Sequence, residues 1–244
     1  MSAAAHVLLN NDLVPAAEAR VSALSDGFLY GHGVFETVRA RAGRALYLAD
    51  HHARLAASCA ALGLEAPPSV ADLDHAIGRL LASARMPAAA VKILRFQDLA
   101  RTAQLITART YPYSPAHYLR GFRLQTFKQG ERDGRLTAHK SLNYLENHLA
   151  RRAAREAGCD DALFVTPAGA VLEGSATSLF VVRNGRALTP PLAANILPGV
   201  ARARVLALLG AMPVSQIDGR KVSKAPAEFT HNLRLRLFDH ERAR

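Results

Sequence analysis

The hydrophobic pattern changes its period several times within the first 110 residues, and this feature limits the possible folds most strongly. Val34–Ala40 alternates in the manner of a strand, and Arg44–Leu48 follows a turn, so the two segments predict a hairpin. From Asp50 the apolar residues recur at helical spacing, and a second amphipathic helix is predicted over Asp72–Arg85. Further strands are predicted at His6–Leu9, Val91–Phe96 and Gln104–Ala108. Strands mixed with helices in this way predict an α+β domain.

A proline-rich break, Tyr111–Pro112–Tyr113–Ser114–Pro115, separates this part from the rest of the chain. We therefore predict an N-terminal α+β domain over residues 1–112, a linker over 113–121 and a C-terminal domain over 122–244. The second domain is predicted to be rich in strands, with helices over Leu142–Ala157 and Val200–Leu209.

Composition excludes several classes of protein. No apolar run among the 244 residues approaches the ~20 residues of a bilayer span, and the first 13 residues do not resemble a secretion signal. The sequence therefore predicts a cytoplasmic protein without membrane contact. Cys59 and Cys159 are not in a metal-binding spacing, and the ten histidines form no ligand motif, so no metal is predicted.

The formal net charge of +11 is compatible with anionic small molecules or with nucleic acid. The basic residues are scattered, aromatic residues make up 6% of the chain, and tryptophan is absent. A platform on which bases could stack is therefore not evident, and we predict no nucleic-acid partner.

Three segments combine reactive residues with unusual local sequence. Lys140 is a lone lysine between a predicted strand and a predicted helix, where a partly apolar pocket would make it a nucleophile for carbonyls. Glu173 ends a strand before a small, polar turn. Gly199 opens a helix whose free N–H groups suit an anion such as phosphate. Each feature taken alone also fits a surface lysine, a turn glutamate or a helix start without a ligand.

Together these segments resemble the class IV aminotransferases, the fold type IV enzymes that depend on pyridoxal phosphate. Five segments resemble motifs of that family, in the family's order along nearly the whole chain: Asp26–Thr37, His51–Leu55, Lys140–Leu145, Glu173–Gly174 and Ile196–Gly199. The resemblance implies a small N-terminal α+β domain, a barrel-like C-terminal domain and a homodimer.

The resemblance also implies roles for particular residues. Lys140 would form the Schiff base with pyridoxal 5′-phosphate and carry the proton at the substrate carbon. Glu173 would keep the pyridine nitrogen protonated, and Arg54 would hold the phosphate. The remaining implied residues are Tyr144, Val200, Ala201 and Asn232 for the cofactor, and Tyr30 and Phe35 for the amine substrate.

Some positions depart from the family's pattern. His32 stands where the family commonly has aspartate, and Ala201 replaces a frequent threonine. The tail Glu228–Leu233 resembles the last family motif, but the sequence ends soon afterwards, which leaves the role of Asn232 open.

Two reactions of the family fit the sequence. The shortness of the chain, and the lack of a clear arginine motif after Val91–Phe96, favour a lyase that converts 4-amino-4-deoxychorismate to 4-aminobenzoate and pyruvate in folate biosynthesis. The alternative is an aminotransferase acting on branched-chain or D-amino acids with a 2-oxo acid acceptor. A third possibility is a basic regulatory or nucleic-acid-binding protein that keeps an inactive cofactor fold, against which the joint presence of Lys140, Glu173 and Arg54 argues.

Overall fold

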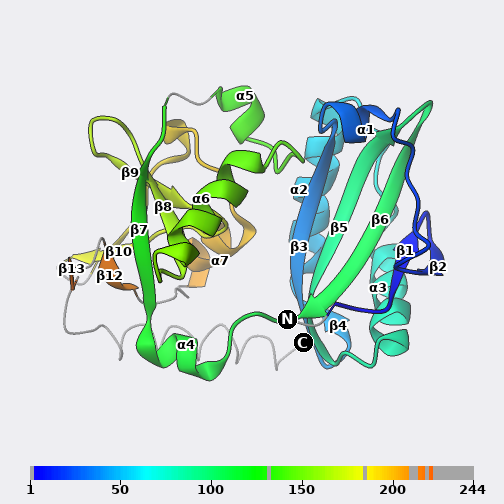
Figure 1. Cartoon of the computed structure of the whole chain (residues 1–244), viewed down its shortest axis with the longest axis horizontal. Helices are drawn as coiled ribbons and strands as arrows, with labels where there is room; N and C mark the ends of the chain where they lie inside the picture. The colour runs from blue at the N-terminus through cyan, green and yellow to red at the C-terminus, as the bar shows by residue number, and fades with distance from the viewer. Residues whose placement is uncertain (1–2, 131–132, 184–185, 209–213, 218–219, 222–244) are drawn as a thin grey trace. The chain divides into compact units, whose positions relative to one another are not determined.

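The computed structural model describes residues 3–130, 133–183, 186–208, 214–217 and 220–221 (Figure 1). The chain divides into two compact units. The first consists of Met1–Pro112 together with His139–Asn143, and the second of Tyr113–Ala138 and Tyr144–Arg244. No helix among the described residues has both the length and the apolar character needed to cross a membrane.

The first unit is built on a six-stranded sheet in the order β2-β1-β6-β5-β3-β4. Its strands are all antiparallel to their neighbours. They span His6–Leu9 (β1), Asp12–Pro15 (β2), Gly33–Arg41 (β3), Arg44–Ala45 (β4), Ala88–Asp98 (β5) and Arg101–Thr110 (β6). The long strands β3, β5 and β6 confirm the strands predicted at Val34–Ala40, Val91–Phe96 and Gln104–Ala108.

Two helices, α2 over Leu48–Ala61 and α3 over Val70–Ser83, cover one face of this sheet (Figure 1). The side chain of Ser69 caps α3 by accepting a hydrogen bond from the N–H of Asp72. The apolar faces of both helices meet alternate residues of β3, β5 and β6 and form the main core, which includes Val38, Leu55, Cys59, Leu73, Ile77, Leu80, Val91, Ile93 and Ile106. A short helix, α1, spans Asp26–Leu29.

The predicted strand Arg44–Leu48 is too long, because β4 ends at Ala45. Tyr47 has a left-handed backbone with φ of 54°, and α2 begins at the next residue. A residue in that conformation turns the chain out of the strand, so the C-terminal part of the predicted segment becomes the start of the helix.

An ion pair joins α2 to the helix-facing side of β3. Glu36 is 1% exposed, and its carboxylate accepts hydrogen bonds from Nε and Nη2 of Arg54, both at 2.6 Å. Nδ1 of His51 lies 2.7 Å from Oε2 of the same carboxylate. Burial acts to raise the pKa of Glu36, but the hydrogen bonds and positive charge of His51 and Arg54 outweigh burial and hold that pKa below its ordinary value.

Residues 139–143 lie with the first unit because they pair with an edge of β3. The N–H of Phe35 donates to the carbonyl of Lys140 at 2.8 Å, and the N–H of Leu142 donates to the carbonyl of Gly33 at 2.9 Å. Val34 and Ser141 form an antiparallel bridge between these two hydrogen bonds. The sequence-based boundaries assigned residues 139–143 to the C-terminal domain. Their pairing with β3, which lies more than 100 residues earlier in the chain, places them in the first unit instead.

The second unit contains a five-stranded sheet in the order β13-β12-β7-β8-β9. Strand β7 is parallel to β12 and β8, and β9 is antiparallel to β8. The strands span Phe122–Lys128 (β7), Asp161–Val165 (β8), Val171–Gly174 (β9), Val214–Ile217 (β12) and Arg220–Lys221 (β13), and a separate hairpin pairs Val181–Arg183 (β10) with Arg186–Leu188 (β11). The mixed α+β class predicted for the chain is confirmed.

Helix α6, Leu145–Glu156, connects the parallel strands β7 and β8, and it begins three residues later than predicted. Ala150 and Ala154 on this helix pack with Ala162, Phe164 and Leu172 of the sheet. Within the described residues, this unit also contains the helices α4 (Pro115–Arg120), α5 (Gly134–Thr137) and α7 (Val200–Leu208), and the short 3-10 helix Leu192–Ala194. The segment 113–121, predicted as a linker, thus contains α4, because proline is accepted in the first turn of a helix.

The buried ion pair gives a prediction for stability. We expect Glu36→Gln to lower the free energy of unfolding by about 3 kcal/mol at pH 7, because the side chain of Arg54, which is only 13% exposed, then loses the charge that compensates its partial burial. Denaturant unfolding of the two proteins would measure the difference. The exposed substitution Glu18→Gln is the matched control and should change stability by less than about 0.5 kcal/mol.

The stability difference between wild type and Glu36→Gln should also depend on pH. Since the folded-state pKa of Glu36 is lowered, its contribution is complete above the ordinary carboxyl value of about 4.3 and is lost as the pH falls through the folded-state value. The difference between wild type and Glu36→Gln should therefore shrink as the pH is lowered from 7 below 4. A constant difference at every pH would contradict an electrostatic origin.

Candidate functional site

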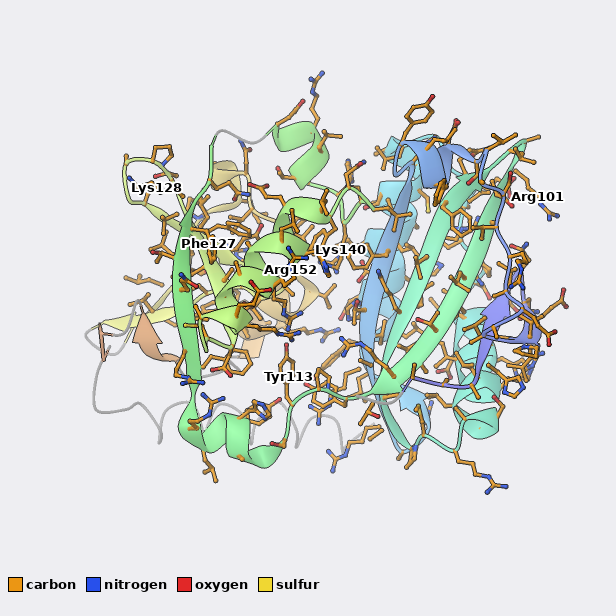
Figure 2. The ribbon with its side chains drawn as sticks, viewed as in Figure 1. Arg101, Tyr113, Phe127, Lys128, Lys140 and Arg152 are labelled. Carbon is orange, nitrogen blue, oxygen red and sulfur yellow. The ribbon has the colours of Figure 1, made fainter. Side chains whose placement is uncertain are left out.

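Lys140 is held on the first unit by the edge pairing with β3 and is labelled in Figure 2. Its Nζ lies 4.4 Å from the centroid of the Phe35 ring. Because side chains alternate along an extended segment, Lys140 shares the sheet face of Phe35, whereas its neighbour Ser141 faces α2 and α3 with Val34. His139 also faces the helices, with Nδ1 3.2 Å from Oγ of Ser58.

Two glycines allow the Lys140 segment to approach this closely. A Cβ on Gly33 would lie 2.7 Å from a side-chain carbon of Leu142 and 2.7 Å from the carbonyl oxygen of Arg95. Gly31 has a φ of 66°, and a Cβ there would lie 2.6 Å from the side-chain oxygen of Asn143. The glycines at positions 31 and 33 are therefore explained by packing, because Leu142 and Asn143 approach them too closely for a side chain to fit.

The sheet face that carries Phe35 also carries several cations. Lys92, on the neighbouring strand β5, has its Nζ 4.2 Å from the centroid of the same Phe35 ring. Burial and the nearby charge of Arg109 lower the pKa of Lys92. Phe35 itself is 6% exposed, so the ring is enclosed between side chains that include two lysines.

Arg54, predicted as the phosphate ligand, lies on the other side of β3. Its contacts with Glu36 hold the guanidinium group in one orientation, and its side chain is 13% exposed.

The predicted substrate residue Tyr30 lies in a different environment from Phe35. It follows α1 and is 70% exposed, with no place in the apolar cluster. His32, which stands where the family commonly has aspartate, has its Nε2 2.8 Å from the carbonyl oxygen of Leu62, at the end of α2.

Glu173 lies in the second unit, near the end of β9, and is 7% exposed. Oε2 of Glu173 accepts a hydrogen bond of 3.2 Å from the N–H of Leu197, in the segment before α7. The following residue must be glycine, since a Cβ on Gly174 would collide with Oγ1 of Thr177. Glu173 is thus a buried carboxylate with a hydrogen-bond donor, unlike a solvent-exposed glutamate in a turn.

Tyr144 precedes α6 and points toward the turn after β9. Its hydroxyl donates to the carbonyl of Ser175 at 2.8 Å, and Nδ2 of Asn147 donates to the same carbonyl at 2.9 Å. The Ser175 hydroxyl donates to the fully buried carboxylate of Asp161, which also accepts from Thr177 at 3.1 Å. This network fixes the turn that follows Glu173.

Val200 and Ala201 form the start of α7, as predicted, but the two residues differ in exposure. Val200 is buried, and Ala201 is exposed. A Cβ on Gly199 would lie 2.8 Å from Oγ of Ser178, so the chain packs tightly where the helix begins. Asn232 lies outside the described residues.

The predicted residues fall into two groups within the described parts of the chain. The first unit brings Lys140 onto Phe35 and holds Arg54 on Glu36, whereas the second unit holds Tyr144, Glu173 and Val200. Sequence reasoning missed Glu36, His51 and Lys92. The signals were present, because Glu36 is a carboxylate at a core-facing position of an alternating strand, and His51 precedes Arg54 by three residues on a helix.

Comparison with known proteins identifies relatives over most of the chain. The family model described as amino-transferase class IV matches residues 33–228. A putative branched-chain-amino-acid aminotransferase of Methanocaldococcus jannaschii is 31% identical over 212 residues, which cover 83% of this chain and 74% of that protein. A D-alanine aminotransferase of Bacillus licheniformis is 26% identical, with 95% of each chain covered.

Solved structures share the fold. The branched-chain aminotransferase of Thermoproteus uzoniensis with norvaline has a TM-score of 0.82 and 24% identity, covering 96% of this chain and 94% of that one. A hypothetical aminotransferase from Mycobacterium tuberculosis in its PLP-bound form has a TM-score of 0.81 and 22% identity, covering 96% and 99%. Because the family model spans well over half of the residues, this chain belongs to the class IV aminotransferase family.

Proposed function

We propose that this chain is a pyridoxal-phosphate-dependent aminotransferase that moves an amino group between an amino acid and a 2-oxo acid. The observation that carries this proposal is the position of Lys140. Its primary amine is fixed on the Phe35 ring by the pairing of its backbone with β3, in a chain of the class IV family. A homodimer and a cytoplasmic location, both expected from the sequence, are part of the same proposal.

The residues present fit pyridoxal phosphate by their chemistry. The aldehyde requires a primary amine, which Lys140 supplies. The phosphate requires cations and N–H donors, which suits Arg54 and the start of α7 at Val200 and Ala201. The ring nitrogen requires a carboxylate, and Glu173 is buried and held by the Leu197 N–H. When bound, the cofactor supplies an electron sink for the negative charge that develops at the substrate carbon bearing the amine.

Three residues of this chain would do the remaining work. The ε-amine of Lys140 accepts the proton from the amine-bearing carbon of the substrate and returns it as a general acid. The Glu173 carboxylate keeps a proton on the ring nitrogen through its negative charge. The pairing of Arg54 with Glu36 fixes the guanidinium before the phosphate arrives, which lowers the entropic cost of binding it.

The comparisons support the aminotransferase, the alternative in the sequence analysis, better than the lyase that the sequence favoured. Two of the relatives reported above are named as a putative branched-chain-amino-acid aminotransferase and a D-alanine aminotransferase. We therefore propose branched-chain or D-amino acids as donors. The formation of 4-aminobenzoate from 4-amino-4-deoxychorismate is the second outcome that an assay must test.

The assay separates these reactions directly. The purified protein, loaded with pyridoxal phosphate, is offered L-valine, L-leucine, L-isoleucine and D-alanine, each with 2-oxoglutarate, and separately 4-amino-4-deoxychorismate. We expect glutamate to form with at least one amino acid donor and no 4-aminobenzoate to form. Release of 4-aminobenzoate and pyruvate without any amino transfer would overturn the proposal in favour of the lyase.

Lys140 should be the lysine that holds the cofactor. Borohydride reduction of the loaded protein fixes pyridoxal phosphate covalently to that lysine, and peptide mass spectrometry locates it. We expect the label on Lys140, and its loss in Lys140→Ala with the fold retained. Lys128→Ala, which removes an exposed lysine, is the control and should leave the label in place. A label that persists in Lys140→Ala would refute the assignment.

Glu173 should affect turnover more than binding. Glu173→Gln keeps the size of the side chain but removes the negative charge, so we expect kcat to fall at least ~100-fold, which is about 2.7 kcal/mol in the barrier. Cofactor retention should remain close to that of the wild type, as measured by the bound fraction after gel filtration. The control Glu156→Gln changes an exposed residue of α6 and should leave kcat within about twofold. Near-normal kcat in Glu173→Gln would refute the role.

A further inference from the structure

The buried hydroxyl of Ser58 has a partner from a distant part of the chain. Ser58 lies on α2 and is 2% exposed, beside the core residues Leu55 and Cys59. A buried hydroxyl costs stability unless it is hydrogen-bonded. Its Oγ lies 3.2 Å from Nδ1 of His139, which comes 81 residues later. Because a hydroxyl can donate or accept, this contact suits either tautomer of the ring and accounts for a polar residue in the core.

His139 stands where the chain enters the first unit. Helix α5 belongs to the second unit, whereas residues 139–143 belong to the first. At the other end of this segment, Nδ2 of Asn143 donates to the carbonyl of Gly31 at 3.4 Å. The two backbone hydrogen bonds with β3 lie between these side-chain contacts. The segment that carries Lys140 is therefore tethered at both ends as well as in its middle.

The face of α2 that carries Ser58 also carries the two partners of Glu36. His51, Arg54 and Ser58 are spaced by three and then four residues, so they lie along one face of the helix. His51 and Arg54 contact the Glu36 carboxylate on β3, and Ser58 contacts the segment that pairs with β3. One rigid helix thus holds both Arg54 and the segment of Lys140.

We propose that His139, held by Ser58, is a positioning residue for the amine of Lys140. This assignment rests on the proposed function, which gives that amine its role in the reaction. Because successive side chains of an extended segment point to opposite faces, His139 bound on the helix side keeps Lys140 on the side of Phe35. The contact therefore opposes rotation of the backbone at Lys140, which would carry the amine off the ring.

The position of the amine matters because it must reach a proton on the substrate carbon. A displacement of about 1 Å in a reacting group can lower a rate about a hundredfold. The side chain of His139 lies on the opposite side of the segment from Phe35, away from the face of the amine. Loss of the contact should therefore lower kcat and change the affinity for the substrate little.

Three substitutions test the contact. His139→Leu removes the ring nitrogens and keeps apolar bulk, His139→Asn keeps a polar group near the position of Nδ1, and Ser58→Ala removes the hydroxyl. We expect His139→Leu and Ser58→Ala each to lower kcat at least about tenfold with the best amino acid donor, and to change KM less than about threefold. His139→Asn should recover most of kcat. The double variant should lose no more than either single variant, because both substitutions remove the same contact.

Two controls separate the position of Lys140 from the stability of the first unit. His75→Leu replaces an exposed histidine of α3, and Ile77→Val removes a methyl group from the main core. Both should leave kcat within about twofold of the wild type. Thermal unfolding measures how much stability each variant loses, so Ile77→Val shows what lost stability alone does to the rate.

Amide hydrogen exchange makes the test independent of catalysis. The N–H groups of Phe35 and Leu142 donate the two hydrogen bonds between β3 and the segment of Lys140. Exchange in peptides that contain these residues therefore reports how firmly the segment is held. We expect it to accelerate at least about fivefold in His139→Leu and in Ser58→Ala, with exchange in α3 unchanged.

The outcomes distinguish the positioning role from the proposed function. If the wild type transfers no amino group, the proposed function fails, and faster exchange in the variants still supports the positioning of Lys140 by His139. If the wild type is active but kcat is normal in both His139→Leu and Ser58→Ala, the positioning role is overturned and the function stands. Unchanged exchange, losses of kcat that multiply in the double variant, or an equal loss in Ile77→Val would also overturn it.

Discussion

The pairing of residues 140–142 with the edge of β3 determines the arrangement of the first unit around Lys140. Two backbone hydrogen bonds, Phe35 to Lys140 and Leu142 to Gly33, set the register of this pairing. Because the register decides which side chains share a face, it places Lys140 with Phe35 and sends Ser141 toward the helices. A shift of one residue would reverse these positions, so a single short backbone contact determines whether Lys140 lies on the face of Phe35.

The two faces of β3 carry opposite kinds of chemistry. On the helix side, the Glu36 carboxylate is buried and fully compensated by Arg54 and His51. On the other side, Lys92 and Lys140 share the ring of Phe35, and no carboxylate stands on the adjoining rows of the three central strands. One strand therefore separates a neutralised internal ion pair from a face with excess positive charge. Part of the positive charge of the chain thus lies on this face, where it would attract negatively charged groups.

In the second unit, side-chain hydrogen bonds rather than strand pairing hold the segment next to the Glu173 carboxylate. Glu173 comes at the end of β9, and the turn after it is fixed by hydrogen bonds from Tyr144 and Asn147 to the carbonyl of Ser175. The buried carboxylate of Asp161 also fixes that turn, because it accepts hydrogen bonds from the hydroxyls of Ser175 and Thr177. Rigid support of this kind would suit the role proposed for Glu173, because a mobile carboxylate would lose the geometry of its hydrogen bond.

The sequence by itself determined the class of fold and most of the helices and strands. Period-two alternation identified β3, and helical spacing identified α2 and α3, because both patterns are local consequences of burying one face. Tertiary structure alone decided the rest. It moved His139–Asn143 from the predicted second domain into the first unit, left Tyr30 exposed, paired Glu36 with Arg54 and brought Lys92 to the ring that Lys140 contacts. These outcomes depend on strand register and on contacts between residues far apart in the chain, and no local pattern encodes either of them.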